Sequence, residues 1–165
     1  MLLYFSGSGQ DSQDELIHFS TIPNTKQVEL EPFYEALKNA EFGRPRFSVI
    51  EQLAQHHIER GISDSILYYG TLYLKEIGNW DTSETNVATY SAKAYYILGE
   101  GSKFKGLFDN AVRYHIKGVG EAEKSRNTEY LFKNKIGLAN SYNRKKEPKK
   151  AAIVLNEVLN KHRSQ

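Results

Sequence analysis

The segment AYYILGEGSKFKGLFDNAVRYHIKG, Ala94–Gly118, decides the fold of this chain. Apolar residues recur along it every three or four positions, which is the period of an amphipathic helix. The pattern stops at a cluster of small and polar residues and then resumes, so the segment predicts two helices joined by a short turn. A lone hairpin of this kind cannot bury its apolar stripe, whereas stacked copies can.

The bulk composition is that of an ordinary globular domain. The chain has 165 residues, 39% hydrophobic and 25% charged, and no apolar run approaches the ~18 residues that a membrane span needs. MLLYF is too short, and interrupted too soon by polar residues, to act as a secretion signal. The absence of cysteine excludes disulfides and cysteine-ligated zinc. We therefore expect a cytoplasmic protein with no membrane association.

The net charge of +2 hides an uneven distribution. Residues 1–100 contain 7 Lys or Arg and 14 Asp or Glu, whereas residues 101–165 contain 15 and 6. A basic segment can contact nucleic acid or an acidic protein surface. Single-strand binders interleave basic residues with exposed aromatic rings, and this segment does not. Solvated helix faces are therefore the preferred interpretation, and nucleic-acid binding ranks last among the alternatives.

From about residue 48 the chain predicts six helices in three hairpins, with no strand pattern. The hairpins cover about 48–78, 84–124 and 128–162. Start signals precede most of the helices: a capping box in SVIE at Ser48–Glu51, Asp64 or a neighbouring serine, NWDTSETN, SRNTEY, and Pro148 in a first turn.

Residues 1–47 are expected to form an N-terminal helical cap that is partly flexible. SQDE at Ser12–Glu15 is a second possible capping box, STIPNTKQ is expected to be a loop, and ELEPFYEALKNAEFG predicts a helix closed by Gly43.

A shift of forty residues overlays the hairpins. It superimposes Ile58, Leu98 and Leu138, and it also superimposes Thr71, Ala111 and Ala151. Small residues are expected where two helices of a hairpin approach closely, which explains the recurring alanine. The repeat predicts an all-α fold of about three stacked hairpins.

The second and third hairpins carry a family resemblance. Gly99, Gly106 and Ala111 with Phe108 and Tyr114 resemble a tetratricopeptide (TPR) repeat, as do Leu138–Ala139, Tyr142, Ala151 and Leu155. The period of forty residues, Ser102 in place of an aromatic residue, and Lys149–Lys150 at the turn depart from the usual pattern.

Longer-period arrays of this type occur in the Rap/PlcR/NprR/Rgg group of bacterial peptide-sensing regulators and in kinesin-light-chain-like adaptors. EAEKSRNTEYLFKNKIGLANSY resembles both. The resemblance implies a right-handed α-α superhelix of TPR-like hairpins that binds peptides and acts in regulation such as quorum sensing.

Enzymatic chemistry finds little support in the sequence. His56 and His57 are adjacent, so on a helix their side chains diverge by about 100° and cannot chelate one metal ion. His115 occupies a position that Leu155 fills in the next repeat, which predicts a packed, hydrogen-bonded ring. The glycine-bearing segments lack phosphate-loop spacing. We expect no catalytic residues, no metal and no cofactor, and we expect the tyrosine stripes to pack between helices.

A peptide-binding site is expected on the concave side of the array, which the first helix of each hairpin would line. Asparagine amides can bond a peptide backbone, and lysine or arginine can bond carboxylates. The resembled arrays commonly carry a backbone-clamping asparagine at the position of Asn140. With Leu98 and Leu138 as buried anchors, the predicted site comprises Lys93, Tyr96, Glu100, Lys103, Lys133, Asn140, Asn143 and Arg144, with His56 and Arg60 from the first hairpin.

The sequence thus favours a non-enzymatic peptide- or protein-binding module that acts as a sensor or adaptor. One alternative is a structural module that forms a homodimer end to end, because a short array leaves an apolar end. The other is nucleic-acid binding through the basic C-terminal third.

Overall fold

A computed structural model of the protein describes residues 24–163. This part of the chain contains seven helices and no strand, which confirms the all-α prediction. The chain divides into two compact units, Met1–Asn39 and Ala40–Gln165. The possible capping box at Ser12–Glu15 lies outside the described residues.

The first unit contributes one described helix, α2 (Asn24–Asn39). The sequence placed a loop over its first residues and closed the helix at Gly43. The prediction was wrong at both ends, because the helix begins earlier, accommodates Pro32 in its interior and ends at Asn39.

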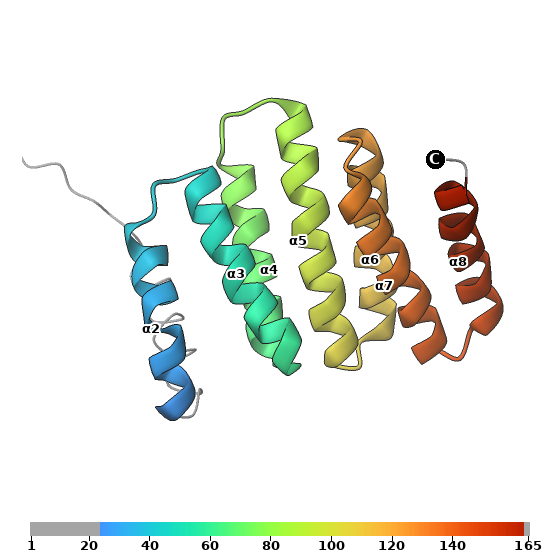
Figure 1. Ribbon diagram of the computed structural model, residues 1–165, viewed down its shortest axis with the longest axis horizontal. Coiled ribbons are helices and arrows are strands. Elements are labelled where there is room, and N and C mark those ends of the chain that lie inside the picture. The colour runs from blue at the N-terminus through green and yellow to red at the C-terminus, as the bar shows by residue number, and fades with distance from the viewer. Residues whose placement is uncertain (1–23, 164–165) are drawn as a thin grey trace, which may run out of the picture. The chain divides into compact units, whose positions relative to one another are not determined.

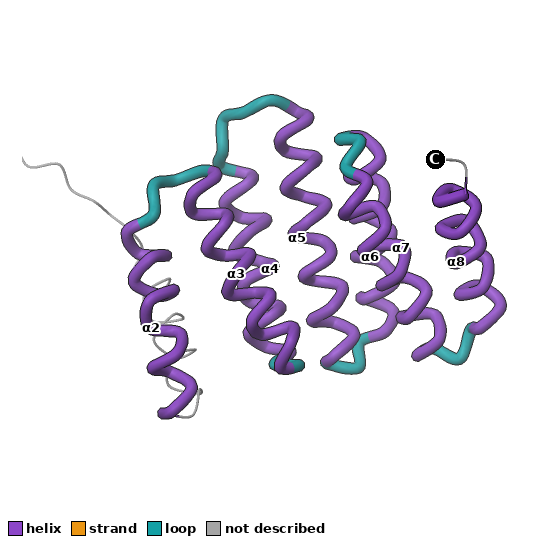
Figure 2. Tube along the Cα trace, in the orientation of Figure 1, coloured by secondary structure: helices purple, strands orange, loops and turns teal. Residues whose placement is uncertain are grey.

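The second unit consists of six helices in three hairpins. They are α3 (Arg44–Arg60) with α4 (Ser63–Gly78), α5 (Glu84–Phe104) with α6 (Phe108–Lys124), and α7 (Thr128–Arg144) with α8 (Pro148–Arg163). Figures 1 and 2 show these helices following one another along the unit, joined by short loops. None of the helices within residues 24–163 is both long enough and apolar enough to cross a bilayer.

Several helix starts use the predicted signals. The side chain of Ser83 accepts a hydrogen bond from the backbone N–H of Asn86 at the start of α5, and that of Asn127 accepts one from Tyr130 N–H at the start of α7. Each satisfies a backbone donor that has no partner inside its helix. Pro148 opens α8 as predicted.

The start of the first hairpin differs from the prediction. Helix α3 begins at Arg44, so Ser48 lies inside the helix and its capping box is not used. Gly43 precedes the helix with a φ of 102°, a conformation that favours glycine, and Pro45 fits the first turn because that turn needs no N–H donor. Asp64 does not cap α4 either. It lies in the first turn of that helix after Ile62.

Within the second unit each helix packs on the next along the chain, and the first helices of successive hairpins also touch: α3 contacts α5, and α5 contacts α7. An aromatic cluster joins the first two hairpins. The ring of Phe47 is fully buried and lies 5.1–5.2 Å, centroid to centroid, from those of Tyr73, Trp80 and Tyr90. These tyrosines therefore pack between helices, as the sequence indicated.

The hairpin turns give the true register of the repeat. Backbone N–H groups of Ile62, Leu107 and Glu147 each donate to the carbonyl five residues earlier, so these three positions are equivalent. The offset is forty residues between the second and third hairpins, as predicted. Between the first and second it is forty-five, because α5 is four residues longer than α7 and follows a longer connection. The counterpart of Leu98 is thus Leu53, and the predicted alignment of Ile58 was wrong.

Candidate functional site

The first helices of the three hairpins share a surface built from tyrosine rings and charged side chains. We call it the first-helix face and define it by Glu51 on α3, by Tyr90, Lys93 and Tyr96 on α5, and by Tyr130 and Lys133 on α7. The rings of Tyr96 and Tyr130 meet edge to face, with centroids 5.9 Å apart, and so connect α5 to α7. The ammonium groups of Lys93 and Lys133 both lie over tyrosine rings of this face, in cation–π contacts.

Lys93 is held between hairpins. Its Nζ lies 2.8 Å from Glu51 Oε1 and 3.1 Å from Oε2, and it also lies over the rings of Tyr90 and Tyr130 at 5.2 and 5.5 Å from their centroids. The hydroxyl of Tyr73 donates a hydrogen bond to the same carboxylate. These contacts tie α3 to α5 through Lys93 and leave it little capacity for a ligand.

Lys133 occupies the equivalent position on α7 and is less constrained. Its Nζ lies 4.6 Å from the ring centroid of Tyr130 and 5.9 Å from that of Tyr96. Its carboxylate partner is Glu129 of the same helix, 2.7 Å away, and the lysine side chain is 41% exposed. Such exposed pairs contribute little and exchange easily with other anions. The preceding hairpin carries Tyr96 at the position equivalent to Glu51, so among the described residues no carboxylate of that hairpin pairs with Lys133.

Two tyrosines of this face, Tyr96 and Tyr130, stay neutral. Burial, and then the nearby carboxylate of Glu100, raise the pKa of Tyr96 to about 12. Burial, and then the charge of Glu51, raise the pKa of Tyr130 as well. Both rings therefore present an uncharged face to cations and a hydroxyl donor.

The row of predicted residues continues along α7. Asn140, Asn143 and Arg144 are exposed, and within the described residues their side chains form no hydrogen bond or ion pair. Lys133, Asn140 and Arg144 are seven and four residues apart, so they lie on one side of the helix. Three of the predicted residues thus share one accessible strip.

Glu100 and Lys103 do not belong to that accessible strip. Their ion pair is 2.5 Å long, and the two side chains are only 9% and 17% exposed. Helix α5 packs against α4, α6 and α7, and these two side chains lie largely covered among them. The structure therefore places Glu100 apart from the accessible strip, paired with Lys103.

His56 and Arg60 were placed by the wrong register. The positions of the first hairpin equivalent to Tyr96 and Glu100 are Glu51 and Gln55. His56 is half-buried with its ring centroid 5.4 Å from that of His57, and Arg60 is exposed, with its guanidinium donating to the His56 carbonyl at 3.3 Å. The sequence missed Glu51, Tyr90 and Tyr130, of which Glu51 could have been found by aligning the turns.

A buried polar cluster lies beside the first-helix face, between the second and third hairpins. His115 Nδ1 lies 3.4 Å from Asn134 Oδ1, and Nε2 lies 3.6 Å from Glu100 Oε1. The Asn134 amide also donates to the carbonyls of Ala92 at 3.1 Å and Tyr130 at 2.8 Å. The prediction of a packed, hydrogen-bonded ring at His115 is confirmed.

Glycines make room for this cluster. A Cβ on Gly99 or Gly137 would lie 2.4 or 2.3 Å from the His115 ring, and a Cβ on Gly118 would lie 2.1 Å from Asn134 Oδ1. The ring thus fills a slot between α5 and α7 that only glycine leaves open. Burial lowers the pKa of His115 to about 4, outweighing the opposing effect of Asn134, and Lys103 lowers it further.

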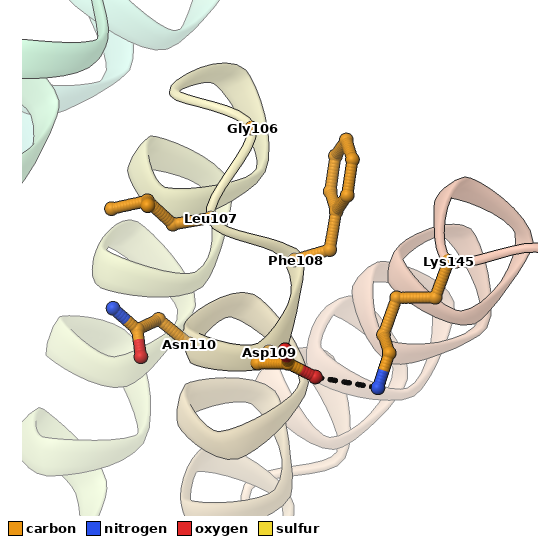
Figure 3. Close-up of a pocket in the computed structure, with 6 residues that line it drawn as sticks. All are labelled: Gly106, Leu107, Phe108, Asp109, Asn110 and Lys145. Atoms are coloured by element: carbon orange, nitrogen blue, oxygen red, sulfur yellow. Dashed lines mark ion pairs between the residues drawn. The ribbon is translucent and has the colours of Figure 1, made fainter.

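A shallow hollow of about 370 Å³ lies away from this face, at the turn between α5 and α6 (Figure 3). It is lined by the turn and first residues of α6 and by Lys145, whose Nζ lies 2.5 Å from Asp109 Oδ1. Among the residues that the structure describes, no three His, Asp or Glu side chains gather in a way that could hold a metal ion.

The chain matches no protein-family model, no curated protein and no solved structure at a significant level.

Proposed function

We propose that this protein is a non-enzymatic helical-repeat module of the TPR type, a right-handed superhelix of hairpins that binds an extended peptide along its first-helix face. The resemblance of its second and third hairpins to peptide-sensing regulators favours a role as a regulatory sensor or adaptor. Lys133 and Asn140 would be its principal ligand contacts.

One observation carries the proposal: an accessible strip of hydrogen-bonding groups along α7, beside paired tyrosine rings. Lys133 is 41% exposed and rests on Tyr130, and Asn140 lies two turns further on the same side with its amide exposed. An amide offers both a donor and an acceptor to a peptide backbone, and the lysine offers three donors to a carboxylate. The Tyr96 and Tyr130 rings supply apolar area for the side chains between.

The mechanism would be a shift between arrangements of the hairpins. A ligand that contacts Tyr96 on α5 and Asn140 on α7 binds best to one relative placement of the second and third hairpins. It therefore increases the population of that placement by its difference in affinity between the two states. Surfaces elsewhere on the array change with it.

Calorimetric titration of the full chain tests this proposal. The probe is a synthetic peptide selected from a phage-displayed random dodecapeptide library. We expect Lys133→Ala and Asn140→Ala each to weaken binding about five- to tenfold, which corresponds to the loss of one hydrogen bond or ion contact of about 1 kcal/mol.

Lys117→Ala is the matched control, because this exposed lysine also lies over a tyrosine, Tyr95, at 5.5 Å, but on the second helix of its hairpin. It should leave the affinity unchanged. Full affinity in both Lys133→Ala and Asn140→Ala would remove the proposed site.

A further inference from the structure

Helix α8 leaves exposed a face whose counterpart in the preceding hairpin, on α6, is covered by other helices. Leu155 and Leu159 on α8 are 38% and 55% exposed. In the turn register they correspond to His115 and Val119 on α6. His115 is fully buried against α5 and α7, and Val119 packs against the cluster that contains Leu131 of α7. Helix α8 therefore presents, uncovered, the surface on which α6 receives α7.

An ion pair accompanies each described junction between hairpins. Lys105, in the turn after α5, bonds Asp64 in the first turn of α4 at 2.6 Å. Lys145, in the turn after α7, bonds Asp109 in the first turn of α6 at 2.5 Å. Each lysine precedes the equivalent turn residue of its hairpin, Leu107 or Glu147, by two positions. Each aspartate follows the turn residue of its own hairpin, Ile62 or Leu107, by two positions. The array thus repeats one rule: the turn lysine of a hairpin meets an acid on the second helix before it.

Helix α8 breaks this rule by reversing the charge. The residue two positions after Glu147 is Lys149, and the first turn of α8 contains no acidic residue. Lys149 is exposed, as are Lys146 and Arg144 nearby, and within the described residues none of the three side chains has an ionic partner. Another hairpin of the same kind would place its turn lysine against Lys149, which is unfavourable.

The same argument disfavours a second copy docked head to tail. The counterpart of Lys105 and Lys145 in the first hairpin is Arg60. If α3 of a second copy packed on α8 in the register of the array, Arg60 would meet Lys149. Like charges at such positions are destabilising. The surface is complementary to a helix that carries an acid at this place.

We propose that the α8 face docks an amphipathic helix of a partner protein. The partner's apolar stripe covers Leu155 and Leu159, and an acidic side chain meets Lys149 where the repeats of this chain would carry lysine. Burial of the two leucines supplies most of the affinity, because apolar area dominates such contacts and exposed ion pairs contribute little. The charge selects the partner. This surface is distinct from the first-helix face, so the inference does not depend on the proposed peptide site.

The experiment uses the full chain and two labelled peptides. Both peptides carry residues 127–147, which contain the helix that packs on α6, and one has the substitution Lys145→Glu. Binding is measured by fluorescence anisotropy. We expect the Lys145→Glu peptide to bind about two- to fivefold more tightly than the unmodified one, in line with a surface ion pair.

Variants of the protein locate the binding. In Lys149→Glu protein the order of the two peptides should reverse. In Leu159→Asp protein both should lose about tenfold or more in affinity, and circular dichroism checks that this exposed substitution leaves the fold intact. Failure of both peptides to bind, or an order that Lys149→Glu leaves unchanged, overturns the proposal. Sedimentation that reveals a dimer abolished by Leu159→Asp also overturns it, because the occupant would then be a second copy.

Discussion

At the scale of single residues, Asn134 determines how the second and third hairpins meet. Its amide nitrogen donates to two backbone carbonyls, those of Ala92 and Tyr130, so its oxygen is left to accept. The facing His115 Nδ1 must therefore carry the proton, which fixes the tautomer of a fully buried ring. A buried amide whose donors and acceptor are all used specifies one alignment of the two helices.

The glycines around this cluster give a matched pair of substitutions on α6. Gly118→Ala would force a Cβ to within 2.1 Å of Asn134 Oδ1, whereas a Cβ on Gly120 has nothing within 4 Å. We expect Gly118→Ala to lower the free energy of unfolding by about 2 kcal/mol through overpacking. Gly120→Ala should raise it by roughly 0.5–1 kcal/mol, because alanine is the better helix former.

Urea denaturation of both variants measures these changes. Similar effects of the two substitutions would mean that the close approach of α6 and α7 is not specific.

The sequence predicted part of this residue-level detail. A histidine aligned with Leu155 indicated a buried position for His115, and this was confirmed. The role of Asn134 could not be predicted, because its partners include a backbone carbonyl forty-two residues away. The glycines were visible in the sequence, but nothing there shows which side chain fills the space that they leave.

At the scale of helices, Glu51, Lys93 and Tyr73 form the polar connection between α3, α4 and α5. The two side chains of the ion pair are 25% and 21% exposed, so solvent screens their attraction only in part. A double-mutant cycle with Glu51→Gln and Lys93→Met should give a coupling of about 1 kcal/mol in the free energy of unfolding.

The pair Glu129–Lys133 serves as a comparison, because it is more exposed and lies within one helix. Its coupling should not exceed about 0.5 kcal/mol. Equal couplings in thermal or urea unfolding would contradict the structural role assigned to Lys93 and would return it to the set of available ligand contacts.

The sequence predicted the start of a helix correctly where a capping residue lay at the true boundary, as Ser83 and Asn127 do. The start of α3 did not, because Gly43 and Pro45 begin it without a side-chain cap. A capping-box pattern inside a helix, as at Ser48, is indistinguishable by sequence from one at its end. Local signals therefore place helices better than they place helix ends.

At the scale of the whole molecule, the stability of the protein should depend on the protonation of His115. Burial lowers the pKa of its imidazole from 6.5 to about 4, so the folded state binds a proton less readily than the unfolded state. The contribution to stability is fully present above pH 6.5 and is lost as the pH falls toward 4. It amounts to about 3 kcal/mol.

The measurement compares the native protein with His115→Leu, which carries the residue of the equivalent position on α8. Carboxylates titrate in both proteins, so the difference between their unfolding free energies from pH 7 to pH 4 isolates the histidine. A difference that does not change with pH would show that the ring is not buried in its neutral form.

The register of the repeat explains what the sequence could and could not predict about the candidate site. Between the second and third hairpins the forty-residue offset holds, and Lys133 and Asn140 lie on the accessible side of α7. The offset between the first and second hairpins is five residues larger, because α5 and the connection before it are longer. Extra residues at a helix end are tolerated because they do not disturb packing inside a hairpin. A constant period therefore selected His56 and Arg60 and missed Glu51. The burial of Glu100 depends on the helices packed around α5, which no local sequence pattern reveals.

The slot for His115 has a consequence for how such an array can change. One ring requires glycine in two helices at once, at Gly99 of its own hairpin and at Gly137 of the following hairpin. One hairpin of this chain therefore cannot take the place of another. A recombinant that duplicated or reordered them would bring a Cβ or an unmatched ring to the junction, so viable rearrangements must alter three distant codons together.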